Sequence, residues 1–136
     1  MPRNFGGWLR AGNVMPRILF AALAALVLGV IAIPSATAHA LLRHAEPAMD
    51  STVKTAPTEL LLVFSEPVES SFSRVEVTDM HGARADAGTV RADPKDGRRL
   101  LVPLKTMAPG KYTVTWHATS ADTHKTQGSF VFTVAP

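Results

Sequence analysis

The stretch from Lys111 to Ser120, KYTVTWHATS, alternates between apolar and polar side chains. Apolar residues occupy every second position from Tyr112 to Ala118, so they would share one face of an extended strand. The threonines and His117 would share the other face, where a polar side chain is simply solvated. No stretch after residue 40 shows a sustained helical period. This part of the chain is therefore predicted to be all-β.

Turn signals divide the same region into short strands. His-Gly, Asp-Gly and Pro-Gly pairs stand at 81–82, 96–97 and 109–110, and such pairs supply the backbone angles that turns need. Pro103 favours an edge strand or a bulge. Turns at this spacing predict an antiparallel sandwich or a Greek-key barrel. We expect strands at 41–45, 58–67, 71–80, 84–92, 99–104, 111–120 and 128–134.

The first 38 residues have the composition of an export signal. Three arginines precede an apolar run at 18–33, and small residues follow it. The run is shorter than the roughly 18–20 residues of a membrane-spanning helix. We predict a cleavable signal peptide at 1–38, with Met15 as an alternative start, and a folded domain at 39–136 that is exported to the periplasm.

The predicted domain carries no net charge. All 11 acidic residues lie after residue 38, whereas 3 of the 14 lysines and arginines lie before it, so 11 of each sign remain. A nucleic-acid-binding domain needs a basic face, and this balance gives no support for that partner. There is no cysteine, so packing must hold the domain without disulfides. No second apolar run follows, and we expect the mature form not to be embedded in a membrane.

The stretch from Ser35 to His44, SATAHALLRH, contains two candidate signal-peptidase sites. Cleavage after Ala38 makes His39 the first residue, whereas cleavage after Ala40 removes it. A free α-amine has a pKa of about 7.7–8.0, so a metal deprotonates it readily. Together with ring Nδ1, this amine would close a six-membered chelate. The first cut therefore makes His39 a candidate ligand with two nitrogens.

Asp122 and His124 form a second candidate for metal binding. They lie two residues apart between predicted strands, and an extended backbone would place both side chains on one side. The pair alone is a weak motif, because aspartate also stabilises loops. With His39 it would supply three nitrogens and a carboxylate, which suit Cu(II) better than tetrahedral Zn(II). Three further histidines are expected at the surface: His44, His81 and His117.

These residues make the chain similar to a known family. It resembles the CopC family of exported copper-binding proteins. The absence of cysteine is part of this resemblance. The most specific part runs from Trp116 through Asp122 and His124 to Gly128. The resemblance implies a seven-stranded antiparallel Greek-key β-barrel or sandwich, cupredoxin- or immunoglobulin-like. The matching segments are His39 after the cut, AEP at 45–47, VFSEPVE at 63–69 and PGKYTVTWHATSADTHKTQGSFVFTV at 109–134.

The resemblance also implies the ligands and the role. Copper in the Cu(II) state would be held by the amine and imidazole of His39, by His124 and by Asp122, with Glu66 as a further ligand. The protein would be a monomeric copper carrier or buffer for copper homeostasis and resistance. It would pass copper to an inner-membrane transporter of the CopD kind.

Some relatives hold Cu(I) through clustered methionines, whose soft thioethers suit that ion. Here the matching region offers only Met80, with His81 beside it. We therefore expect the Cu(II)-only form.

Two other functions remain open at this point. An N-terminal histidine chelate on a β-sandwich also resembles copper monooxygenases that cleave polysaccharides. Such enzymes need a flat aromatic face, whereas Tyr112 and Trp116 are predicted to point inward, so we expect no enzyme. A metal-free immunoglobulin-like interaction module would bind no Cu(II) tightly.

Overall fold

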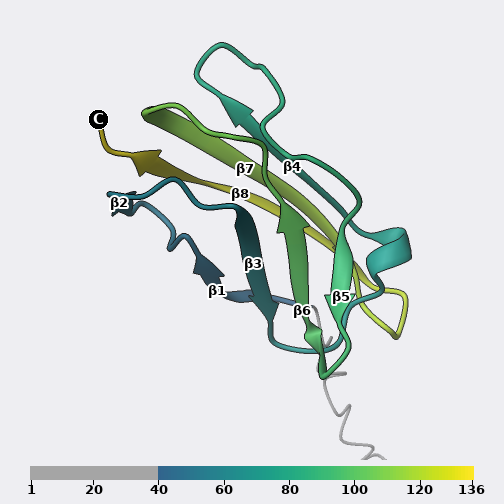
Figure 1. The fold of residues 1–136 in the computed structure, drawn as a ribbon. Coiled ribbons are helices and arrows are strands. Elements are labelled where there is room, and N and C mark those ends of the chain that lie inside the picture. The colour runs from purple at the N-terminus through teal and green to yellow at the C-terminus, as the bar shows by residue number, and fades with distance from the viewer. Residues whose placement is uncertain (1–39) are drawn as a thin grey trace, which may run out of the picture. The chain divides into compact units, whose positions relative to one another are not determined.

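A computed structural model describes residues 40–136 as two four-stranded sheets that pack face to face (Figure 1). The predicted signal peptide and His39 lie outside the described residues. One sheet has the strand order β1-β3-β6-β5, and the other has the order β2-β8-β7-β4. The strands are β1 (Leu42–Glu46), β2 (Thr52–Val53), β3 (Glu59–Phe64), β4 (Arg74–Asp79), β5 (Arg91–Asp93), β6 (Asp96–Pro103), β7 (Gly110–Thr119) and β8 (Lys125–Val134), and a single 3-10 turn, η1 (Ser70–Phe72), precedes β4.

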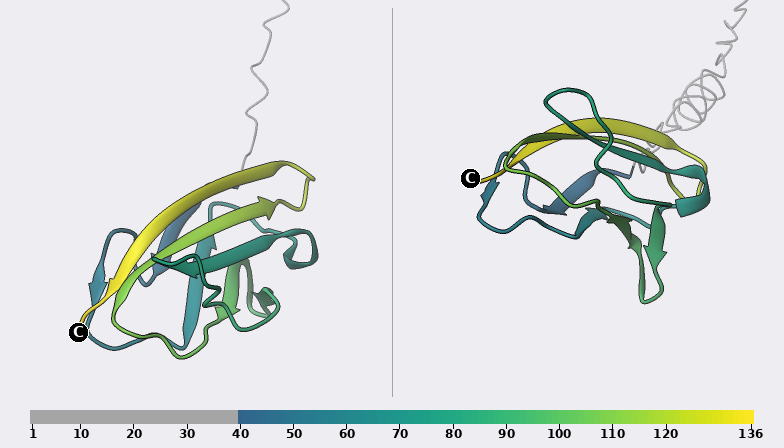
Figure 2. Two further views of the ribbon diagram at one scale, coloured as in Figure 1. Left: turned by 90° about the horizontal axis from the view of Figure 1, so that it is seen from above. Right: turned by 45° about the horizontal axis from the view of Figure 1, so that its top comes forward.

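The all-β prediction is confirmed, and within residues 40–136 no helix is long and apolar enough to cross a bilayer. The long strands β7 and β8 pair along their whole length and curve over one side of the domain (Figure 2). As predicted, the apolar face of β7 is buried between the sheets. Trp116 meets Phe64 of the opposite sheet edge-on, with ring centroids 5.3 Å apart. This aromatic contact joins the two layers.

The strand count and one pairing differ from the prediction. Within the described part there are eight strands, because β2 adds a pair of residues beside β8. The β2–β8 pairing is parallel, whereas the other pairings are antiparallel. Two residues carry no alternation pattern, so no sequence signal marks this strand.

The expected strand at 84–92 is mostly irregular, and only Arg91–Asp93 is regular strand. Isolated bridges join Arg84 to Thr78 and Asp86 to Leu104 earlier in that segment. Pro103 was expected on an edge strand or at a bulge, but β6 lies between β3 and β5 and pairs with β3 at Pro103 without a register shift. Pro103 ends β6 beyond Leu101, the last residue of β6 that pairs with β5, so its missing N–H costs no bond to that strand.

Candidate metal centre

The turn between β7 and β8 brings Asp122 and His124 into direct contact. His124 Nδ1 lies 2.8 Å from Asp122 Oδ2, and each side chain is close to half exposed. The sequence argument assumed an extended backbone, and that assumption is wrong. Thr123 has a φ of 73°, in the left-handed region that β-branched residues rarely occupy. A tight turn, and not a strand, therefore sets this pair.

Ser120 holds the turn together from inside the domain. It is 1% exposed, and its Oγ donates a hydrogen bond to Asp122 Oδ1. Its backbone N–H donates to the carbonyl of His124 at 2.9 Å, and its own carbonyl accepts from the N–H of Thr123 at 2.9 Å. The sequence analysis did not single out Ser120, because a serine before a turn carries no signal of burial.

Hydrogen bonds also set the charge of Asp122. Donation from Ser120, and then from His124, lowers the pKa of the Asp122 carboxyl below its ordinary value. An ionised carboxylate only accepts hydrogen bonds, so Nδ1 of His124 carries the proton in this contact. A neutral imidazole with its proton on Nδ1 has its lone pair on Nε2, which is the nitrogen that can coordinate a metal in this arrangement.

The first described residues are fixed beside this turn. The hydroxyl of Thr126, two residues after His124, donates to the carbonyl of Ala40 at 2.8 Å. Leu41 and Ser65 exchange two bonds, from Leu41 N to Ser65 Oγ at 2.9 Å and from Ser65 N to Leu41 O at 2.8 Å. Ala40 is therefore held by β8, and Leu41 is held by the residue that follows β3.

Glu66 lies between a residue that bonds the first described residues and a residue that bonds the β7–β8 turn. Ser65 before it bonds Leu41, and the carbonyl of Pro67 after it accepts from the N–H of Ala121 at 3.2 Å. Oε1 of Glu66 is buried and has no hydrogen-bond partner within residues 40–136. A buried carboxylate oxygen without a partner is costly, and a cation or a proton donor would relieve the cost. Glu66 is thus suited to face a positively charged group here.

The described residues alone do not complete a metal site. Among residues 40–136, no three His, Asp or Glu side chains lie together in an arrangement that could hold an ion. Asp122 and His124 are brought together, whereas Glu66 is not grouped with them. The proposed amine and imidazole of His39 lie outside the described residues.

The other candidate side chains lie elsewhere. His44 pairs with Glu46 on β1, with Nε2 and Oε1 3.0 Å apart. His81 and His117 are exposed, as expected. Met80 is 68% exposed beyond the end of β4.

Comparison with known proteins identifies relatives along most of the chain. A family model described as "CopC domain" matches residues 42–135. Protein YobA of Escherichia coli K12 is 40% identical over 87% of this chain and 95% of its own length. Copper resistance protein C of Escherichia coli is 36% identical over 80% of this chain and 90% of that protein. Copper transport protein CutJ of Bacillus subtilis is 31% identical over 80% of this chain, which is 20% of that protein.

A solved structure has the same fold. The crystal structure of CopC from Methylosinus trichosporium OB3b superimposes with a TM-score of 0.68 at 28% identity, covering 72% of this chain and 95% of that one. Family model, relatives and fold agree, and the chain belongs to the CopC domain family.

Proposed function

We propose that this chain is an exported Cu(II)-binding protein for copper homeostasis or resistance, with copper as its cargo. The observation that carries the proposal is the Asp122–His124 pair. His124 Nδ1 lies 2.8 Å from Asp122 Oδ2, and the buried Ser120 holds Asp122 in place by a hydrogen bond. A fixed nitrogen and oxygen pair lowers the ordering cost of coordination. Similarity to a protein named copper resistance protein C supports copper as the ion.

In this proposal the mature chain begins at His39, which supplies its amine and ring nitrogen. His124 adds a third nitrogen. Asp122 contributes an oxygen directly if its bond to His124 opens, or orients the imidazole if that bond persists. Glu66 is the remaining candidate, and its buried Oε1, which has no hydrogen-bond partner within residues 40–136, supports it. Nitrogen and carboxylate donors in a tetragonal set favour Cu(II), whereas thioethers would favour Cu(I).

We further propose that the protein acts as a monomeric periplasmic carrier or buffer and passes copper to an inner-membrane transporter. The similarity to a region of a protein named copper transport protein supports this step. An enzymatic role has no comparable support. Tyr112 and Trp116 are buried in the described domain, so they offer no flat aromatic face to a polysaccharide.

The test is a Cu(II) titration of protein that begins at His39, followed by calorimetry or by a competing chelator. We expect one tight site, and His39→Ala or His124→Ala should weaken it by about 100-fold or more, a loss of about 3 kcal/mol. Retaining Ala38 converts the amine to an amide and should have a similar effect. His81→Ala, an exposed histidine outside the site, is the matched control.

Unchanged affinity in His39→Ala would show that the proposed site is wrong. No tight binding at all would favour the metal-free interaction module. The mass of the exported protein decides the starting residue, and a chain that begins at Leu41 would remove the chelate.

A further inference from the structure

A groove of about 460 Å³ crosses the outer face of β4, β7 and β8, next to the turn that carries Asp122 and His124. Arg74, His117 and Gln127 form one row across it, because Arg74 pairs with His117 and His117 pairs with Gln127. Lys125, directly after His124, and Phe72 of η1 complete the wall. The groove is therefore lined by hydrogen-bond donors, positive charge and one aromatic ring.

The positive charge of this groove is not neutralised from within the domain. Arg74 and Lys125 form no ion pair within residues 40–136, and no carboxylate lines the groove in that part of the chain. Four other arginines there are paired with acids: Arg84, Arg91, Arg98 and Arg99. Because the predicted domain has equal numbers of acids and bases, this local excess is a property of the face and not of the composition.

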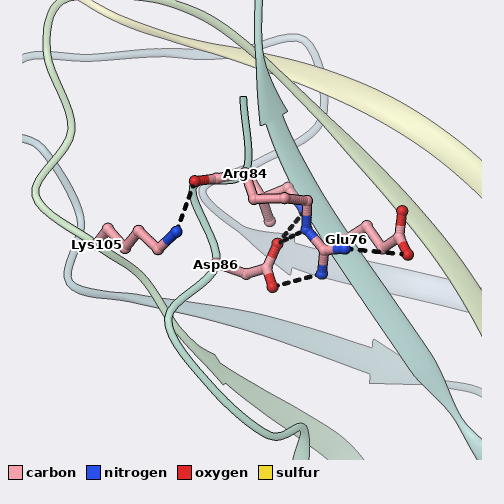
Figure 3. Close-up of polar contacts among 5 residues, drawn as sticks. Glu76, Arg84, Asp86 and Lys105 are labelled. Carbon is pink, nitrogen blue, oxygen red and sulfur yellow. Dashed lines mark hydrogen bonds and ion pairs between the residues drawn. The ribbon is translucent and has the colours of Figure 1, made fainter. Parts of the chain in front are cut away.

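The nearest acidic residue to Arg74 on β4 already forms an ion pair with another arginine. Glu76 lies two residues from Arg74 on β4, but its Oε1 is 3.2 Å from Arg84 Nη1 (Figure 3). Asp86 holds the same guanidinium through Nε at 2.7 Å and Nη2 at 2.6 Å. Glu76 therefore faces a cation that is fixed in place, and its charge is not available to neutralise the groove.

Phe72 adds an apolar contact at a fixed position. Its side chain is 75% exposed, although its carbonyl accepts a hydrogen bond from Thr119 Oγ1 at 3.0 Å. Ser73 Oγ accepts a second bond, from the N–H of Thr119 at 3.1 Å. An exposed aromatic ring on an anchored backbone, with an arginine beside it, has the composition of an interface hot spot.

We propose that this groove docks an acidic, extended segment of a partner protein, with carboxylates on Arg74 and Lys125 and an apolar side chain on Phe72. A hollow lined by strands suits a chain segment better than the flat surface of a bilayer. The segment would lie beside His124, so docking would bring the partner to the metal turn. The link to copper transfer rests on the proposed function, whereas peptide binding does not.

The experiment uses isotope-labelled protein that begins at His39 and a short peptide of alternating aspartate and leucine. We expect shifts of the backbone signals of Arg74, His117, Lys125 and Gln127, and affinity that falls with added salt. Arg74→Glu should weaken binding about tenfold or more. Lys111→Glu makes the same charge change on an exposed residue at the far end of β7, and it should bind as the unmodified protein does.

Copper affinity is measured on the same variants, so that failure of the proposed docking site can be distinguished from failure of the proposed Cu(II) site. Peptide binding lost in Arg74→Glu with Cu(II) affinity retained supports the docking site. The proposal is overturned if the peptide shifts nothing in the groove or if Lys111→Glu weakens binding equally. Shifts of the same residues with phosphatidylserine vesicles, but not with peptide, would replace the protein partner with a membrane surface.

Discussion

At the scale of single residues, Ser120 decides how well the metal turn is preorganised. Ser120→Ala removes the donor to Asp122 Oδ1 without adding bulk, so the carboxylate and His124 should lose their fixed geometry. Loss of a group that orients a metal ligand typically reduces metal affinity by about 10–100-fold. We expect that reduction for Cu(II) in a chelator competition with protein that begins at His39. Ser129→Ala, an exposed serine on β8, should leave affinity unchanged, and equal affinity in both variants would contradict the role of Ser120.

At the scale of strands, the pairing of β7 with β8 depends on a missing side chain. Gly128 lies opposite Trp116, and a Cβ there would come within 2.7 Å of the indole Cζ2. Gly128→Ala must displace the ring from Phe64, and overpacking of this kind costs about 1–3 kcal/mol. Thermal unfolding should show a clear loss of stability. Gly97→Ala is the control, because its Cβ would meet Pro67 at an ordinary 3.5 Å; equal stability of the two variants would contradict this account.

The same scale shows how far the sequence could predict the structure. Alternation is a local property, so the buried face of β7 could be read directly from residues 112–118. The parallel partner of β8 and the short β5 depend on contacts between distant segments, which no window of the sequence contains. For the same reason the sequence identified Asp122 and His124 but not Ser120. Nor could it indicate that Oε1 of Glu66 would be buried without a hydrogen-bond partner among residues 40–136.

At the scale of the whole molecule, the Arg84–Asp86 pair links three segments. Asp86 accepts two bonds from the guanidinium of Arg84, and Lys105 Nζ donates to the carbonyl of Arg84 (Figure 3). Asp86 also accepts a bond from the N–H of Val77 on β4 at 2.9 Å. Burial raises the pKa of Asp86, but the bonds from Arg84 and Val77 and the charge of Arg84 outweigh it, so the pKa is lowered. A carboxyl with a lowered folded-state pKa stabilises the fold above its unfolded pKa, about 3.9, and this contribution is lost as pH falls through the folded value.

Asp86→Asn should therefore lower the free energy of unfolding at neutral pH, and the gap to the unmodified protein should narrow as pH falls below about 4. Urea unfolding over a pH series measures both effects. A cycle with Arg84→Gln should be non-additive, because the two side chains contact each other. A gap that stays constant down to low pH would mean that the carboxylate charge contributes nothing.

The bond from Thr126 to Ala40 has a consequence for how fast the proposed site would release its metal. Consecutive Cα atoms are about 3.8 Å apart, so a chain that begins at His39 has its amine tethered one peptide unit from a clamped residue. Its effective concentration at His124 is then set by the tether and not by diffusion. In the proposed site, a copper ion that loses its bond to one nitrogen would stay bound to the others, and the lost bond would form again before the ion dissociates. Release would then require a partner that displaces ligands one at a time, and dilution alone would be slow to empty the site.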